Sequence, residues 1–421
     1  MPKMSGDATQ PRDGRLGLRD GVTLGLSSVV GAGLFAAFAP GATAAGTLLL
    51  AAVLLAGLVA AASAHSMVRL ARRHPGAGGV YIYGRERLGL PWGFIAGWAF
   101  VIGKTVSCAV MAMVIGVHLW PDHPNFVAVL VVLAVLALNL QGMRWPEPLA
   151  RWMVVAVLAL ALIFVVVMLL DPPVTADTPP PVPPDSGGVS GVLQAAGLLF
   201  FAFAGFARLA PFGDLVRDHR RTIPRAIAIS LTAVLALYLL VGFALTDALG
   251  PGWVAAREAP LAEAAEISNG PWLGPALRIG AVLLVGGAVL TLASGVSHIV
   301  RAMARDHHLP RVLSVVEGPR SVPRRADAVV AASVLIVIAL IDLRGAIGYS
   351  SFLALSYYAI ANACALTLDR GVLSRAVPAF GLVSCVVIGV LLPWESVAAG
   401  SVTLAFGAFI GWVRWTTRED R

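Results

Sequence analysis

Residues 21–35 read GVTLGLSSVVGAGLF, an apolar segment in which glycine recurs at positions 21, 25, 31 and 33. Glycine in the middle of a helix exposes the backbone and makes the helix easier to break. A break inside a membrane leaves N–H groups that hydrocarbon cannot satisfy, so these groups must face a cavity or a ligand. We therefore predict an interrupted helix, with Gly31, Ala32 and Gly33 at the start of its second half. That end attracts an anionic group such as a carboxylate.

A second apolar segment carries a matching feature at residues 200–208, which read FFAFAGFAR. We expect the carbonyls of Phe203, Ala204 and Gly205 to accept hydrogen bonds from an ammonium group, with Phe206 closing over the ligand. Taken singly, each set of small residues also fits close helix packing. Taken together, at equivalent places in two halves of the chain, they favour a binding site between inverted repeats.

The composition of the chain is that of a membrane protein. Of its 421 residues, 58% are hydrophobic and 13% are charged, and the mean hydropathy is +0.83. These few charges cannot cover the surface of a soluble domain. Residues 127–140 and 152–170 contain no charged residue. We predict an all-α integral membrane protein with about twelve apolar spans, each near the roughly 20 residues that a bilayer requires: 22–40, 45–68, 92–119, 126–142, 149–170, 190–214, 226–247, 273–303, 327–343, 346–367, 376–393 and 396–413.

The basic residues predict how these spans are oriented. Most of the 31 Lys and Arg residues fall in loops on the same side as the N-terminus: 1–20, 69–87, 144–151, 217–225, 301–325, 370–375 and 414–421. Only Arg257, Arg278 and Arg344 fall on the opposite side. Because cytoplasmic loops carry an excess of positive charge, we expect a multi-pass protein of the cell membrane with both termini in the cytoplasm. The same distribution argues against nucleic-acid binding, despite a net charge of +8.

The spans form a single expected transmembrane domain over residues 21–413, between polar cytoplasmic tails at 1–20 and 414–421. The first tail lacks the basic-then-apolar pattern of a signal peptide. A proline-rich segment at 171–188 reads as an extended linker. It separates a first repeat at about 21–170 from a second at about 190–367, and two extra helices occupy about 376–413.

Two charged residues fall within or near the spans, where charge is costly and suggests a function. Lys104 lies near the expected bilayer centre. It is either a proton-coupling or site-organising group, since a buried lysine loses its proton readily, or a structural lysine bonded to the carbonyls of a broken helix. Arg208 stays charged and cannot relay protons, so we expect it to line the cytoplasmic half of a pathway.

The remaining polar and small residues give weaker predictions. No catalytic residue, metal ligand set or cofactor is expected, although H⁺ or Na⁺ is possible as a coupling ion. Ser294 and Ser297 fit either part of a sodium site or hydrogen bonds to their own helix. Gly407 and Gly411 form a GxxxG pattern, which is a hint of a homodimer within the lipid.

Four stretches together resemble the amino acid–polyamine–organocation (APC) superfamily of permeases. The chain is similar to the motifs of that family in order and spacing, from about residue 17 to 330. The stretches are GAGLF at 31–35, PGAGGVYIY at 75–83, FAGF at 203–206 continuing to TIPRAI at 222–227, and RAMARD at 301–306 followed by Leu309 and Pro310.

The resemblance implies a LeuT-like fold, in which two inverted five-helix repeats are followed by two added helices. It also implies transport of amino acids or related amines by alternating access. The acidic pair common in the family after the sixth helix is reduced here to Asp214, with Asp218 following. The lysine that some proton-coupled relatives carry in the fifth helix is absent from residues 152–170, so that mechanism cannot be carried over.

Other classes of function fit the sequence less well. An exchanger of amino acids or amines stays open beside a permease, and a non-transporting membrane sensor is a weaker alternative. An intramembrane enzyme would carry a motif such as HExxH, and an ATP-driven pump would carry a P-loop; the chain contains neither.

Overall fold

The computed structural model describes the chain over residues 17–74, 79–143, 146–173, 187–206, 219–268, 270, 272–306, 308–317, 322–368 and 371–419. Over these residues the protein is helical, and the only β-type pairing is an isolated bridge between Glu317 and Val322. The helices, in chain order, are α1 (Leu18–Val29), α2 (Ala32–Ala36), α3 (Phe38–Ala45), η1 (Gly46–Leu48), α4 (Leu49–Arg73), α5 (Gly79–Arg87), α6 (Leu90–Leu119), α7 (Pro124–Leu140), α8 (Glu147–Leu170), α9 (Gly188–Phe203), α10 (His219–Leu249), α11 (Pro251–Ala255), α12 (Pro260–Glu266), α13 (Leu273–Arg305), η3 (Arg311–Ser314), α14 (Arg324–Leu340), α15 (Leu343–Leu366), α16 (Val372–Val390) and α17 (Trp394–Glu419).

The helices confirm an all-α membrane protein. Seven of the described helices are long and apolar enough to cross a bilayer, and three shorter apolar helices lie at Gly21–Ala36, Pro124–Leu140 and Ser374–Val390. Helices α14 and α15 occupy the two other predicted spans. The first two predicted spans need a shifted boundary, because α3 continues to Ala45 and the chain turns at Gly46, where φ is +54° and favours glycine.

The contacts between helices repeat when the first five spans are exchanged for the next five. Helix α1 packs on α10, and its counterpart α9 packs on α4; likewise α6 packs on α15, and its counterpart α13 packs on α8. Because each block contains an odd number of spans, the second block begins on the opposite side of the membrane. The protein therefore has the LeuT-like arrangement of inverted repeats, followed by α16 and α17.

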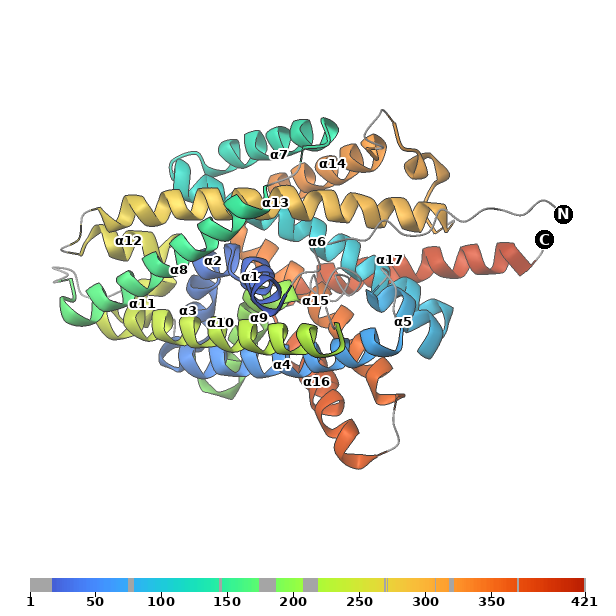
Figure 1. Cartoon of the computed structure of the whole chain (residues 1–421), viewed down its shortest axis with the longest axis horizontal. Coiled ribbons are helices and arrows are strands. Elements are labelled where there is room, and N and C mark those ends of the chain that lie inside the picture. The colour runs from blue at the N-terminus through green and yellow to red at the C-terminus, as the bar shows by residue number, and fades with distance from the viewer. Residues whose placement is uncertain are drawn as a thin grey trace.

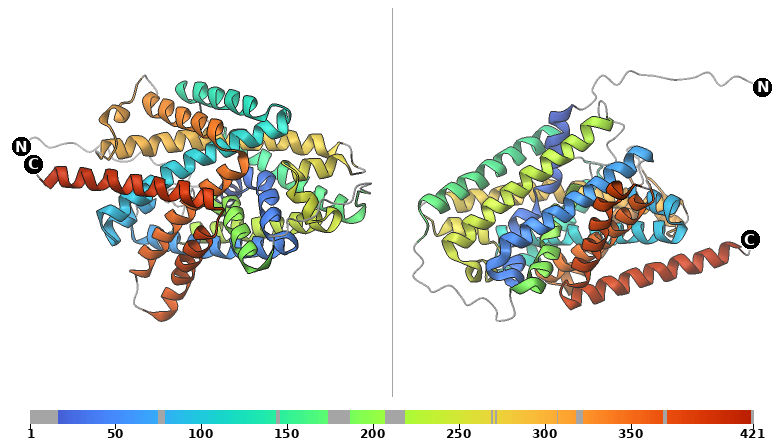
Figure 2. Two further views of the ribbon diagram at one scale, coloured as in Figure 1. Left: turned by 180° about the vertical axis from the view of Figure 1, so that it is seen from behind. Right: turned by 90° about the horizontal axis from the view of Figure 1, so that it is seen from below.

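The centre of the molecule is formed by α6, which packs on α5, α7, α13, α15 and α17. Within its most apolar stretch of 18 residues, 78% is buried inside the protein. The corresponding buried share is 33% for α8 and 17% for α17. Helices α4, α10 and α13 run along the long axis of the molecule (Figure 1). Figure 2 shows α8, α10 and α4 lying side by side, as their contacts require. Helices α8 and α17 thus present apolar side chains to lipid, whereas α6 is a core helix.

Exposed tryptophans mark the two ends of the spans. Successive spans cross in opposite directions, so the starts of α6 and α8 lie on the same side as the end of α17. Among the residues whose side chains the structure describes, each of the two sides carries three tryptophans that are about half exposed or more: Trp92, Trp152 and Trp412 on one side, and Trp120, Trp272 and Trp394 on the other. Tryptophan concentrates at membrane–water interfaces, so these residues indicate where the bilayer ends.

The GxxxG residues of α17 are covered within the chain. A Cβ atom on Gly407 would lie 2.4 Å from Cδ1 of Trp98, and one on Gly411 would lie 3.0 Å from a ring carbon of Phe94. Trp98 also donates a hydrogen bond from Nε1 to the Thr403 carbonyl, at 2.9 Å. These glycines therefore allow α17 to pack on α6, and they do not supply the dimer face that the sequence pattern suggested.

We expect Gly407→Ala to lower the melting temperature of the purified protein, because the added methyl must displace Trp98 from this contact. Overpacking of this kind typically costs about 1–3 kcal/mol. Gly295→Ala is the matched control, since no atom lies within 4 Å of a Cβ at that position. Equal melting temperatures for the two variants in the same detergent would contradict the packing described here.

Candidate functional site

The first transmembrane helix is interrupted where the sequence predicted. Helix α1 ends at Val29, the Val30 N–H still bonds to the Leu26 carbonyl at 2.7 Å, and α2 begins at Ala32 with Gly31 as its N-cap. The first N–H groups of a helix have no acceptor within it. In the described part of the chain, no backbone carbonyl accepts from the N–H groups of Gly31, Ala32 or Gly33. These donors are what a buried anion requires.

The two glycines at this break have different surroundings. Gly31 is buried, yet a Cβ placed on it would meet no atom within 4 Å. A Cβ on Gly33 would lie 2.4 Å from Cα of Ala202 on α9. Gly31 therefore borders open interior space, whereas Gly33 allows the second half of the first helix to approach α9.

The sixth span also loses its α-helical form at the predicted place. Helix α9 ends at Phe203, and residues 204–206 form a 3₁₀ turn. The carbonyl of Ala204 accepts two hydrogen bonds, one from the Tyr358 hydroxyl at 3.0 Å and one from Nζ of Lys104 at 3.3 Å. The ammonium group bound at the Ala204 carbonyl in this structure is thus that of Lys104 and not that of a ligand.

A single tyrosine contacts both interrupted helices. The hydroxyl of Tyr238 on α10 lies 3.3 Å from the carbonyl of Val29 and 3.4 Å from the carbonyl of Ala202. Its ring packs edge-to-face on Phe38 and Phe203, and the side chain is 1% exposed. Tyr238 therefore connects the end of α1 to the last turn of α9.

Phe206 is packed in this structure. Its ring stacks on Tyr358 with centroids 4.8 Å apart, and its side chain is 2% exposed. Gly205, next to it, is half-buried. A role for Phe206 in closing over a ligand stays a prediction.

Lys104 forms a hydrogen bond at the break in the sixth span. From the middle of α6 it reaches the Ala204 carbonyl, and Nζ lies 6.0 Å from the centre of the Phe100 ring. The sequence left open a coupling or site-organising lysine and a structural lysine bonded to a carbonyl of a broken helix; the bond to Ala204 is compatible with both, and the role of Lys104 stays a prediction. Arg208, Asp214 and Asp218 lie outside the described residues.

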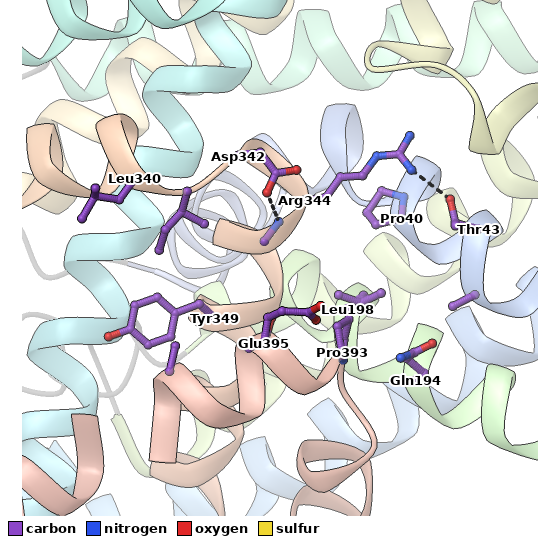
Figure 3. Close-up of a pocket in the computed structure, with 15 residues that line it drawn as sticks. Pro40, Thr43, Gln194, Leu198, Leu340, Asp342, Arg344, Tyr349, Pro393 and Glu395 are labelled. Atoms are coloured by element: carbon purple, nitrogen blue, oxygen red, sulfur yellow. Dashed lines mark hydrogen bonds between the residues drawn. The ribbon is translucent and has the colours of Figure 1, made fainter. Parts of the chain in front are cut away.

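Arg344 joins three elements on the side of the membrane where α15 begins. Its guanidinium donates to the Thr43 hydroxyl of α3 at 3.1 Å and to the Ala255 carbonyl of α11 at 2.6 Å. Figure 3 shows Arg344 at the edge of a cavity of about 730 Å³. Asp342, Gln194 and Glu395 also line this cavity. The Asp342 carboxylate caps α15 by accepting from Gly345 N–H at 3.1 Å. These contacts hold the outer part of the first helix against the α11 segment.

A second set of contacts lies at the opposite ends of the helices. The Tyr81 hydroxyl on α5 donates to the Asp306 carboxylate at 3.0 Å and lies 2.6 Å from Nδ1 of His308. Burial and the nearby charge of Asp306 raise the pKa of Tyr81 to about 12. The hydroxyl therefore keeps its proton at neutral pH.

Sequence reasoning missed Tyr238, Tyr358 and Arg344. Both tyrosines are polar groups inside apolar spans, so the rule that drew attention to Lys104 would have found them. Their partners are backbone carbonyls, which carry no sequence signal. In the sequence, Arg344 is one of the few basic residues on the side of the membrane opposite the N-terminus. Only the fold shows that it contacts α3 and α11.

The comparisons with known proteins agree with this architecture. A family model described as amino acid permease matches residues 16–413. Interrupted first and sixth spans in an inverted-repeat bundle are typical of transporter folds. The chain belongs to the amino acid permease family, and it is a multi-pass membrane transporter and not an enzyme.

Several curated proteins are similar to the chain over most of its length. An uncharacterized transporter of Mycobacterium tuberculosis is 49% identical over 413 residues, which is 97% of this chain and 93% of that protein. A branched-chain amino acid permease of Bacillus subtilis is 26% identical over 76% of this chain and 72% of its own. A cationic amino acid transporter of Arabidopsis thaliana is 28% identical over 72% of this chain and 53% of its own.

We expect Tyr238→Phe to destabilise the protein by roughly 1 kcal/mol, the usual net value of a buried hydrogen bond, because the variant retains the ring but leaves the Val29 and Ala202 carbonyls without their donor. Urea or thermal unfolding in detergent measures this change. Tyr349→Phe is a control that removes a hydroxyl bonded to Thr403 in the described part of the chain, away from both breaks. The prediction is wrong if Tyr238→Phe is as stable as the unmodified protein.

Proposed function

We propose that this protein is a permease that carries amino acids or related amines across the cell membrane by alternating access. The observation that carries the proposal is the break between α1 and α2, where Gly31 borders open interior space beside N–H groups from which no described backbone carbonyl accepts. The family match supports the same class of substrate. The distribution of basic residues supports a cytoplasmic location for both termini.

The substrate carboxylate binds at the N-terminal end of α2 in this proposal. The backbone N–H groups of Gly31, Ala32 and Gly33 supply donors there, and the partial positive charge of a helix N-terminus adds to them. The substrate amine needs a different acceptor from the one expected first, since the Ala204 carbonyl already holds Lys104 and Tyr358. The carbonyls of Phe203 and Gly205 remain as candidates, with Phe206 as the gate.

The charge of Lys104 also bears on the choice of substrate. An ammonium group beside the break repels a cationic side chain more than a neutral one. This favours neutral amino acids over cationic ones. The relatives do not decide between them, because one is named for branched-chain and another for cationic amino acids.

Uptake into proteoliposomes tests the transport proposal. We expect saturable uptake of a labelled neutral amino acid, which an excess of that amino acid inhibits. Gly31→Ala should fold normally but raise the concentration needed for half-maximal uptake, because its methyl enters the open space. Gly33→Ala should instead lose stability, since its methyl meets the Ala202 backbone.

Two outcomes would count against this scheme. Absence of uptake and of exchange for a full panel of amino acids and amines would exclude a permease. Exchange without net uptake would favour an antiporter on the same site. Equal effects of the two glycine substitutions would remove the assignment of Gly31 to the binding space.

We expect Lys104→Met to reduce uptake by at least tenfold while the remaining uptake keeps its dependence on pH. Methionine retains most of the length of the lysine but cannot donate to the Ala204 carbonyl, so the end of α9 loses a charged hydrogen bond worth about 1.5–3 kcal/mol. Initial rates across a pH series measure both properties. Loss of the pH dependence would instead identify Lys104 as the proton-coupling group.

A further inference from the structure

A buried carboxyl group lies in the helix packing between the two repeats. Asp327 is in the first turns of α14, and it is 5% exposed. Its side chain contacts the hydroxyl of Ser297 on α13. In the described parts of the chain no lysine or arginine forms an ion pair with it. An ionised carboxylate without a partner is very costly in such surroundings.

Asp327 borders a small cavity between α6, α7, α13 and α14. The cavity measures about 20 Å³, which is room for one water molecule. Its polar lining consists of Asp327, Ser297, Asn139 and the thiol of Cys108, and the other lining residues are Val, Leu and Ala. Asn139 is 6% exposed.

This lining does not suit a metal cation. Sodium and similar hard cations need a shell of several oxygen ligands, as the six to eight oxygens around calcium illustrate. Here only three side chains offer oxygen atoms. A proton requires one oxygen, and a neutral carboxyl is the form that a hydrocarbon-lined cavity accepts most easily.

The hydroxyl of Ser297 has a second acceptor besides the Asp327 carboxyl. It donates to the carbonyl of Ala293 at 3.1 Å. A hydroxyl has one hydrogen, so in this arrangement its oxygen can only accept from Asp327. A neutral Asp327 carboxyl can donate its own hydrogen to the Ser297 oxygen in this arrangement. If Asp327 ionises, the Ser297 hydroxyl has to turn away from Ala293 and donate to the carboxylate.

We propose that Asp327 is the proton-binding site of this transporter, in which a neutral carboxyl donates to Ser297 and one water bridges it to Asn139. The assignment rests on the proposed transport function for its physiological meaning. Loss of the proton reorients the Ser297 hydroxyl on α13. Helix α13 packs on α8 and on the interrupted first helix through α2, so the protonation state is communicated to the binding region.

The charges around Asp327 leave it the main titrating group of this cluster. From α13 the nearest is His298, which is exposed and whose Nδ1 lies 2.8 Å from the Ser294 carbonyl. Helix α6 contributes the Cys108 thiol, and α7 contributes only the uncharged Asn139. On α14 itself, Arg324 and Arg325 lie 4.0 and 3.4 Å from the Glu317 carboxylate.

Infrared spectroscopy of the purified full chain tests proton binding without any transport. At about pH 7.5 exposed carboxyl groups are ionised, so we expect a residual C=O band from one protonated carboxyl in the unmodified protein. Asp327→Asn should remove that band. Glu395→Gln, which replaces an exposed carboxyl on α17, should leave it in place. Absence of the band in the unmodified protein would overturn the proposal whether or not the variant folds.

Transport in proteoliposomes then tests coupling. Asparagine imitates the protonated carboxyl, since its NH₂ group donates to Ser297 but cannot release a proton. We expect uptake by the unmodified protein to rise with external acidity by up to about tenfold per pH unit, as binding of one proton requires. Asp327→Asn should retain exchange of labelled for unlabelled substrate and lose the response to pH.

The outcomes separate this proposal from the proposed function. An unchanged pH response in Asp327→Asn, or uptake that requires Na⁺ and ignores pH, would overturn proton binding as the coupling step. If no amino acid or amine is transported at all, the transport proposal fails. The infrared result then still decides whether Asp327 holds a proton.

Discussion

The structure depends on one constraint: a backbone polar group inside a bilayer must find a partner within the protein. Breaking the first and sixth spans creates such groups at Val29, Ala202 and Ala204. Side chains from intact helices satisfy them, with Tyr238 from α10, Tyr358 from α15 and Lys104 from α6. The donors at the start of α2 are the exception, because no described backbone carbonyl accepts from them. The interrupted helices are thus supported at their carbonyl ends and open to a ligand at their N–H ends.

Much of the fold could be predicted from the sequence because lipid imposes simple rules on it. Within the described residues the predicted spans fall on helices, and the break at Gly31 falls between α1 and α2; the end of the sixth predicted span, 207–214, lies outside those residues. Hydrophobic length and glycine spacing carry this information directly. The exact turn between the first two spans was missed, because α3 is as apolar as its neighbours and only the backbone conformation of Gly46 ends it.

The candidate site was less predictable, because its partners are brought together by packing and not by spacing. Gly31 and Gly33 are alike in sequence, yet one borders open space and the other meets Ala202. Ala204 was expected to receive the ammonium group of a substrate, and it receives that of Lys104 instead. Gly407 and Gly411 followed a motif for association between chains, but they face α6 of the same chain. Asp327 was unremarked in the sequence, since it lies among arginines at the edge of a span.

The two ends of the molecule are held by different chemistry, and this makes them respond differently to the surrounding solution. Arg344 keeps its charge at every accessible pH, and both of its acceptors are neutral oxygens, so neither acid nor moderate salt alters that contact much. The contact at Tyr81 includes Asp306 and an imidazole, whose hydrogen-bonding role changes when it is protonated. Protonation of the imidazole therefore alters the contact at Tyr81, whereas the contact at Arg344 keeps both of its hydrogen bonds.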